Sequence, residues 1–107
     1  MDNRKSCIVC VGKRADGIAD RIEKYAKDAG FQVRETIFKN AKSVDQMKYY
    51  IERDSIICVL VSDINDISAD KRMVRDVMEL AAEHGISINA ESRGYEPALI
   101  SFEEDNA

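Results

Sequence analysis

At 107 residues the chain has the usual length of one domain, and we expect residues 1–107 to form a single domain around one core. Hydrophobic residues make up 45% and charged residues 34%, with one proline and five glycines, which excludes a disordered or fibrous chain. The net charge of -4 argues against direct binding of nucleic acid, and no apolar run approaches the roughly 20 residues that cross a bilayer.

The chain begins with a predicted strand and helix. Residues 6–11, SCIVCV, form a continuous apolar run, which is typical of a strand covered on both faces. Asp16 is placed to cap a helix that ends before Gly30, because glycine readily adopts the left-handed conformation that stops a helix. The apolar stripe of this helix comprises Ile18, Ile22, Tyr25, Ala26 and Ala29.

A second strand and helix come next. Phe31, Val33 and Ile37 alternate with polar residues, which predicts a half-buried strand at an edge of the sheet. Ser43 and Gln46 have the spacing of a capping box, in which each side chain bonds the backbone of the other residue at a helix start. We therefore expect the second helix to begin after Ser43.

The second half repeats the order of strand and helix. Residues 56–61, IICVLV, are wholly apolar and rich in β-branched side chains, as in a central parallel strand. A third helix is predicted over residues 68–84, with Gly85 as its stop, and Ile86 and Ile88 open a fourth strand. The apolar face of the third helix comprises Met73, Val74, Val77, Met78 and Ala81.

Alternating strands and helices predict an α/β fold with right-handed crossovers. We expect a three-layer open sheet, mostly parallel, with strand order 2-1-3-4 and a flavodoxin-like topology. Residues 95–102 contain Leu99, Ile100 and Phe102, which are too apolar to be left in solvent. A fifth, antiparallel edge strand would cover them, and docking against a second copy or a partner is the alternative.

Ligands of open α/β sheets bind beyond the carboxyl ends of the strands, where the strand order reverses. Here that apex lies between the first and third strands, which places Gly12, Asp63 and Asp66 beside it. Lys13 and Arg14 precede the first helix, whose free backbone donors favour an anion. Lys13 and Arg14 are therefore a candidate anion site, although two basic residues in a solvated loop are common and no phosphate-binding glycine pattern accompanies them.

Clustered carboxylates after the third strand could in principle hold Mg²⁺. Phosphoryl-accepting receiver domains share this topology and carry an aspartate there, but they also need acidic residues after the first strand. This chain has Gly12, Lys13 and Arg14 at that point, so the receiver interpretation fails. Capping of the third helix by Asp66 or Ser68 explains the acids more simply, and we expect no metal and no cofactor.

Three cysteines and a single histidine also fail to form a catalytic pattern. Cys7, Cys10 and Cys58 lie in apolar runs, where cysteine acts as a small hydrophobe, and we expect them buried, reduced and metal-free in the cytoplasm. Cys7 and Cys10 are three apart on a strand and point to opposite faces, so they should neither share a metal nor form a disulfide. His84 ends a helix, where a charge partner for the helix terminus is the simplest role.

Several segments together resemble the N-terminal catalytic domain of the serine recombinases, the resolvases and invertases, over roughly residues 8–90. Residues 8–11 are similar to the first strand of that family, and residues 21–33, RIEKYAKDAGFQV, to its first helix and second strand. Residues 50–68, ending in VSDINDIS, resemble its third strand and exit loop, and residues 82–86 match the end of the helix after that loop. The resemblance implies a resolvase-like fold.

The family's chemistry requires a serine that attacks a DNA phosphodiester and arginines that stabilise the charge on the phosphate. In the motif alignment the serine falls on Gly12 and the arginine before it on Cys10. The exit loop keeps an aspartate as Asp63, but its two arginines fall on Ile64 and Ile67. The resemblance therefore implies a domain without the family's catalytic groups.

The arginine before the family's second helix falls near Ala41, and this sequence lacks the family's long dimerising helix and helix-turn-helix domain.

Two functions from different classes fit these observations. The leading interpretation is a non-enzymatic interaction or regulatory module, associated with a mobile element, that binds a protein partner or a second copy. The alternative is a flavodoxin-like domain that binds a small molecule or anion at Lys13, Arg14, Asp63 and Asp66, and a closed apex would favour the first interpretation.

Overall fold

Four parallel strands form the centre of the molecule, which a computed structural model describes over residues 5–53 and 56–97. The strands lie in the order β2-β1-β3-β4 and alternate with helices along the chain, which confirms the predicted α/β fold and strand order. The strands are β1 (Lys5–Val11), β2 (Phe31–Phe38), β3 (Cys58–Val61) and β4 (Ser87–Ala90). The helices are α1 (Asp16–Asp28), α2 (Ser43–Arg53) and α3 (Lys71–Glu83), with short 3-10 turns η1 (Ile64–Asp66) and η2 (Glu91–Arg93).

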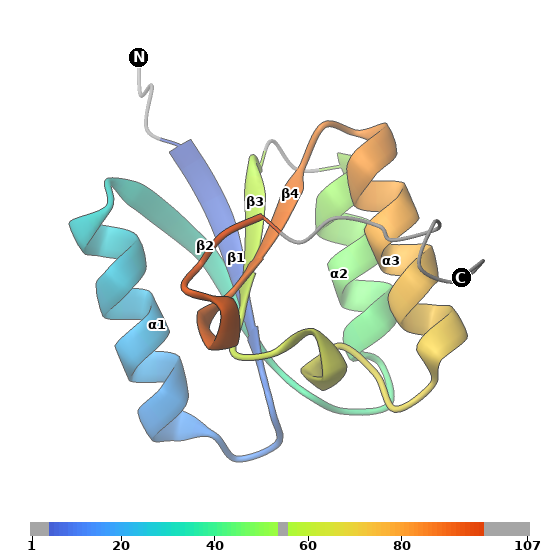
Figure 1. The fold of residues 1–107 in the computed structure, drawn as a ribbon, viewed down its shortest axis with the longest axis horizontal. Helices are drawn as coiled ribbons and strands as arrows, with labels where there is room; N and C mark the ends of the chain where they lie inside the picture. Colours follow the sequence, from blue (N-terminus) through green and yellow to red (C-terminus); the bar gives the residue numbers. More distant parts are fainter. Residues whose placement is uncertain (1–4, 54–55, 98–107) are drawn as a thin grey trace.

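The sheet separates two hydrophobic layers (Figure 1). α1 covers one face of the sheet, and α2 and α3 cover the other. Successive side chains of β1 point to opposite faces, so Val9 packs under α1 while Ile8 packs under α2 and α3. Both faces of β1 and β3 are therefore buried, which explains why these strands read as unbroken apolar runs.

The edge strand β2 contains an irregularity that the sequence pattern does not reveal. In the pairing with β1, the register passes from Val33 to Glu35, so Arg34 is one extra residue in β2. An extra residue shifts the alternation by one position. Val33 consequently packs in the layer of α1, whereas Ile37 packs in the layer of α2 and α3. The simple alternation that predicted this strand is wrong beyond Arg34.

The helices α1 and α3 both end before a glycine. Gly30 and Gly85, at φ values of 89° and 69°, occupy the left-handed conformation that ends each helix, as predicted. The start of α1 differs from the prediction. Asp16 lies inside the first turn, and the residue before the helix, Ala15, supplies no capping side chain. Asp16 thus acts through its charge near the positive end of the helix dipole.

The start of α2 shows that the predicted capping box is wrong. Ser43 is itself the first residue of the helix, and its hydroxyl donates to the carbonyl oxygen of Asn40 at 2.9 Å. The same hydroxyl oxygen accepts from the backbone N–H of Asn40 at 3.3 Å. Ser43 therefore closes the preceding turn, which explains its burial.

The start of α3 also departs from the prediction. Asp70 caps the helix, and its carboxylate accepts from the backbone N–H of Arg72 at 2.9 Å. Neither Asp66 nor Ser68 is the cap residue. Met73, predicted on the buried face, leaves 45% of its surface exposed. None of the helices in the described part of the chain is long and apolar enough to cross a membrane.

The predicted fifth strand falls largely outside the described residues. Within them, Asn89 of β4 forms one isolated antiparallel bridge with Pro97, which is the pairing direction expected for an added edge strand. The rest of that prediction, residues 98–102, lies outside the described residues.

Candidate functional site

The apex of the sheet lies where β1 and β3 end side by side, because the chain leaves these neighbouring strands in opposite directions along the sheet. Gly12 comes directly after β1 and is half-buried, while Asp66 ends η1 after β3. A side-chain carbon built at Gly12 would lie 3.8 Å from Oδ1 of Asp66. The structure thus brings Gly12 and Asp66 together at the predicted apex.

The polar groups after β3 bond to one another. The hydroxyl of Ser62 donates to the carboxylate of Asp66. The carboxylate of Asp63 accepts from the backbone N–H of Asn65 at 2.9 Å, so Asp63 caps η1. The hydrogen bond from the Asn65 backbone lowers the pKa of Asp63, and a hydrogen bond from the Ser92 side chain lowers it further. Asp63 and Asp66 therefore serve local turns.

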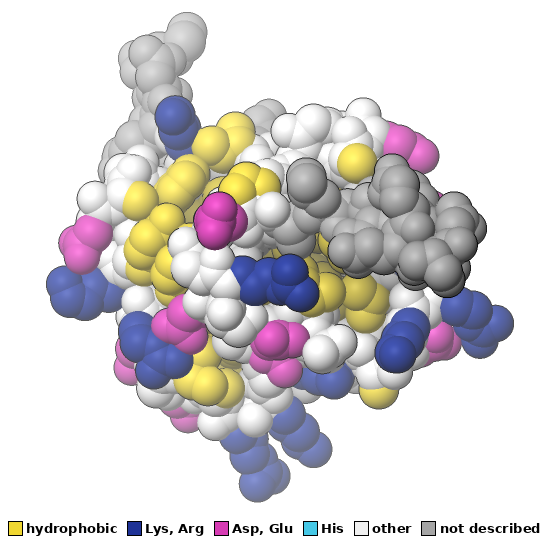
Figure 2. Space-filling view, in the orientation of Figure 1, with side chains coloured by type: hydrophobic (Ala, Val, Ile, Leu, Met, Phe, Trp, Pro, Cys, Tyr) yellow, Lys and Arg dark blue, Asp and Glu magenta, His cyan; other side chains and the backbone are white. Residues whose placement is uncertain are grey.

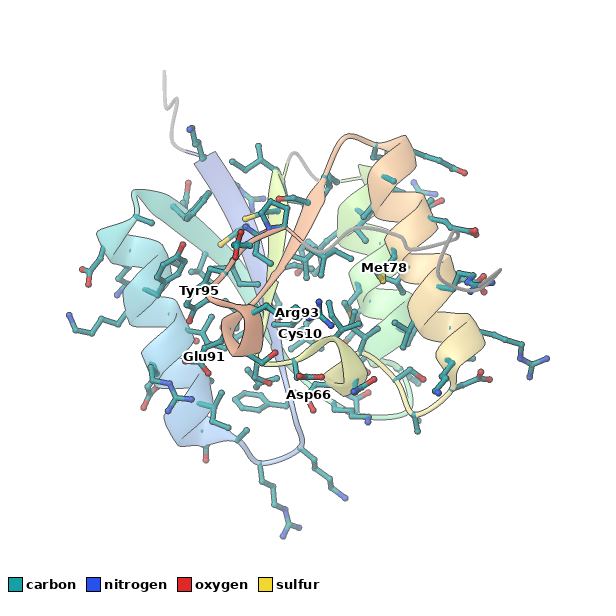
Figure 3. The ribbon with its side chains drawn as sticks, in the orientation of Figure 1. Cys10, Asp66, Met78, Glu91, Arg93 and Tyr95 are labelled. Atoms are coloured by element: carbon teal, nitrogen blue, oxygen red, sulfur yellow. The ribbon has the colours of Figure 1, made fainter. Side chains whose placement is uncertain are left out.

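The turn η2 covers the end of β3 from the side of α1. The backbone N–H of Ser92 donates to the carbonyl oxygen of Ser62 at 3.0 Å. Figure 3 shows Glu91 and Tyr95 on the α1 side of the sheet, whereas Met78 lies on the side of α2 and α3. The hydrogen bond from Ser92 to Ser62 ties η2 to the end of β3 at the apex.

Three apolar side chains, Cys10, Ile64 and Ile67, stand where the sequence resemblance predicts recombinase arginines. Cys10 is fully buried, and its thiol donates to Sδ of Met47 at 3.5 Å. Burial raises the pKa of Cys10 to about 12, with a further contribution from the charge of Asp66. Ile67 is also fully buried, and Ile64 packs against the same layer. Cys10 and Ile67 therefore lie inside the protein, and Ile64 is half-buried against the same layer.

Lys13 and Arg14 occupy a turn at the start of α1. The backbone N–H of Ala15 donates to the carbonyl oxygen of Gly12 at 3.3 Å, and Arg14 takes a left-handed conformation with φ of 59°. Both basic side chains are exposed. Anion binding by Lys13 and Arg14 stays a prediction. Over residues 5–53 and 56–97, no three His, Cys, Asp or Glu side chains are grouped to hold a metal ion.

Charge is mixed on the face of the molecule in view. Figure 2 shows Lys and Arg side chains interspersed with Asp and Glu over this face, without a continuous basic stripe. Proteins that bind DNA through its backbone cluster their cations on one surface.

The cysteines are buried, as predicted, but one relation among them was missed. Cys7 packs in the layer under α1 and Cys10 in the opposite layer, which confirms that these two point to opposite faces. Cys58 packs in the layer of Cys7 and is its register partner across β1 and β3. The predicted strand order makes β1 and β3 neighbours, but the register between them had no signal in the sequence.

A second cluster that sequence reasoning missed joins α1 to the segment after β4. The rings of Tyr25 and Tyr95 stack with centroids 3.6 Å apart and planes at 3°. Arg21 donates two hydrogen bonds to the carboxylate of Glu91, at 2.5 and 2.7 Å. Tyr95 has φ of 65°, a strained conformation that these contacts hold in place. We call Arg21, Tyr25, Glu91 and Tyr95 the tyrosine clamp.

The tyrosine clamp predicts a loss of stability at high pH. Burial, with the nearby charge of Glu91, raises the pKa of Tyr95 to about 12 from an ordinary value of 10.0. The unfolded chain releases this proton first, so the free energy of unfolding should fall as pH rises from about 10 to about 12. Urea unfolding across this range should show a shallower fall for Tyr95→Phe.

Other groups titrate in the same range, so the comparison needs a matched control. Tyr49 is 57% exposed and lies outside the tyrosine clamp, so Tyr49→Phe controls for the removal of a tyrosine hydroxyl elsewhere in the protein. Equal pH profiles for Tyr95→Phe and wild type would contradict the assignment.

The strand order, the crossovers and the position of the apex define a resolvase-like α/β fold. The N-terminal catalytic domain of TP901-1 integrase has this fold, with a TM-score of 0.70 and 20% sequence identity over 83% of this chain and 78% of that chain. No family model matches the sequence, and no curated protein matches it significantly. This structural likeness confirms the predicted fold. At 20% identity it gives no information about the activity of this chain.

Proposed function

We propose that this chain is a catalytically inactive resolvase-like domain that acts by binding a protein partner or a second copy of itself. The burial of two apolar side chains beside the apex carries the proposal. Cys10 and Ile67 occupy the positions of two catalytic arginines, and both are fully buried in the core. A site that had only lost its nucleophile could be restored by one substitution, whereas here the hydrophobic core has taken the place of the charged groups.

The electrostatics of the apex support the same proposal. Phosphodiester attack needs a nucleophile together with positive charge aimed at the developing negative charge. Gly12 supplies no nucleophile, and the carboxylate of Asp66 stands 3.8 Å from where a side chain at Gly12 would begin. A phosphate brought to Gly12 would meet this negative charge.

The binding role rests on what the fold leaves at the surface. Tyr49 on α2 and Met73 on α3 leave 57% and 45% of their surfaces exposed, and Ile57 leaves 41%. Aromatic and methionine side chains are enriched in protein interfaces. In this proposal the module regulates recombination within a mobile element.

We expect the purified protein neither to cleave nor to join DNA. Supercoiled plasmid and short duplexes should remain intact, and denaturing gels should show no covalent protein–DNA adduct. Gly12→Ser should stay inactive as well, because a serine hydroxyl without arginines lacks the larger electrostatic contribution. An active serine recombinase serves as the positive control, and an adduct from either protein would sink the proposal.

The anion-binding alternative gives a different result. Phosphate or a nucleotide would then raise the melting temperature in a saturable way, and Lys13→Ala with Arg14→Ala would abolish the rise. For the proposed binding role, sedimentation over a range of concentrations detects self-association, and immobilised protein captures a partner from an extract of its source cells. Tyr49→Ser should weaken either complex, and circular dichroism verifies that the variant is folded.

A further inference from the structure

Two thiols from opposite halves of the chain meet in the middle of the sheet. Cys7 of β1 and Cys58 of β3 are direct register partners in neighbouring parallel strands. Both side chains are buried and lie in the same layer, under α1. Register partners in adjacent strands lie about 4.8 Å apart, which falls inside the roughly 4.4 to 6.8 Å between Cα atoms that a disulfide spans. Neighbouring strands in this register therefore meet the Cα spacing of a disulfide.

We propose that Cys7 and Cys58 form a reversible disulfide when the protein meets a peroxide. In the first step the Cys7 thiolate attacks a peroxide oxygen, the O–O bond breaks, and Cys7 becomes a sulfenic acid as hydroxide leaves. In the second step the Cys58 sulfur attacks the Cys7 sulfur, the S–O bond of the sulfenic acid breaks, and the leaving hydroxide takes the Cys58 proton to form water. Two thiols and one hydrogen peroxide thus give one disulfide and two water molecules, with two electrons passing to the peroxide.

The local contacts favour Cys7 as the thiol that reacts first. The thiol of Cys58 forms a hydrogen bond with Cys7, and this bond lowers the pKa of Cys7 while burial acts against it. The same bond raises the pKa of Cys58, with burial as the second cause. The more acidic thiol of a pair supplies the thiolate that attacks an oxidant. Cys58 then lies in place as the resolving thiol.

The pair lies near one end of its strands. Lys5, two residues before Cys7, is exposed, and Ile57, which directly precedes Cys58, leaves 41% of its surface exposed. A local opening of the strand ends suffices to admit a molecule as small as hydrogen peroxide. Bulky thiol reagents need a larger opening, so slow labelling of the folded, reduced protein is consistent with the proposal.

Cys10 provides an internal control within the same strand. It packs in the opposite layer, and its register partners are Ile37 and Val61. No resolving thiol faces it in the described structure, and burial raises its pKa to about 12, which suppresses the thiolate. Oxidation should therefore distinguish Cys10 from the other two cysteines.

The test uses the full chain, treated with hydrogen peroxide and compared with the reduced protein. Intact-mass measurement should show a loss of two hydrogen atoms per chain, reversed by dithiothreitol. Peptide mapping without reduction should locate one bond, between Cys7 and Cys58, with Cys10 still a thiol. Cys10→Ala should oxidise like the wild type, whereas Cys58→Ala should yield no intramolecular disulfide.

The wild-type map decides the proposal even if a variant fails to fold. A disulfide that includes Cys10, or bonds between chains in place of the internal one, would overturn it. So would a folded wild-type protein that keeps all three thiols under conditions in which the urea-unfolded chain forms disulfides. Circular dichroism before and after treatment verifies that the oxidised protein is folded.

Discussion

An Ile67→Arg variant should fail to fold at 25 °C. Ile67 is fully buried between the sheet and the helices α2 and α3, so the substitution would place a guanidinium in an apolar layer without a partner. Burying an unpaired charge costs many kcal/mol, against the roughly 5 to 15 kcal/mol that stabilise a small domain. Circular dichroism and a urea titration measure the loss. Placing an arginine at this position, where the sequence resemblance predicts one, would thus unfold the domain.

Ile57→Arg is the matched control, because it makes the same substitution at an isoleucine that is 41% exposed. The long arginine side chain can reach water from Ile57, and we expect a change within about 1 kcal/mol in the free energy of unfolding. A folded Ile67→Arg protein with the stability of Ile57→Arg would show that the apex tolerates charge and would remove the main support for an inactive domain.

Met47→Ala should lower the free energy of unfolding by about 2 to 5 kcal/mol. Met47 is fully buried in α2 and accepts the thiol of Cys10, so truncation removes packing from the helix that covers the end of β1. Because Met47 is fully buried, water cannot fill the space that the truncation leaves. Urea unfolding at neutral pH gives the value.

Met73 in α3 provides the comparison for Met47. It is 45% exposed, and Met73→Ala should change the free energy of unfolding by about 0.5 kcal/mol or less. Similar losses in the free energy of unfolding for the two variants would contradict the assignment of Met47 to the core and Met73 to the surface.

The periodicity of the sequence was enough to predict the fold but not its local details. The unbroken apolar runs predicted the two central strands, because a strand covered on both faces needs no polar side, and Gly30 and Gly85 marked the helix ends. The extra residue in β2, Arg34, was not predictable, since a bulge depends on the neighbouring strand. The helix starts were also misassigned, because Ser and Asp residues near a helix serve several local turns equally well.

The candidate site was predictable in position but not in its contacts. The reversal of strand order placed Gly12 and Asp66 together, and the resemblance to the recombinases identified Cys10 and Ile67 as positions of interest. Burial of Cys10 and Ile67 could not be read from the alignment. The pairing of Cys7 with Cys58 and the tyrosine clamp both join segments far apart in the chain, and no local pattern records such contacts.

The all-parallel sheet has a consequence for how the chain acquires its structure during synthesis. No two of the described strands are joined by a hairpin, and β1 gains its central neighbour β3 only when Cys58 has been made, half the chain after Cys7. In parallel pairing of this kind a long loop must close, at a cost in chain entropy, before the two strands form stabilising contacts. Folding is therefore slower than for helical or hairpin proteins of the same size. During synthesis the apolar strand β1 can therefore pair with β2 on one edge well before β3, its neighbour on the other edge, has been made.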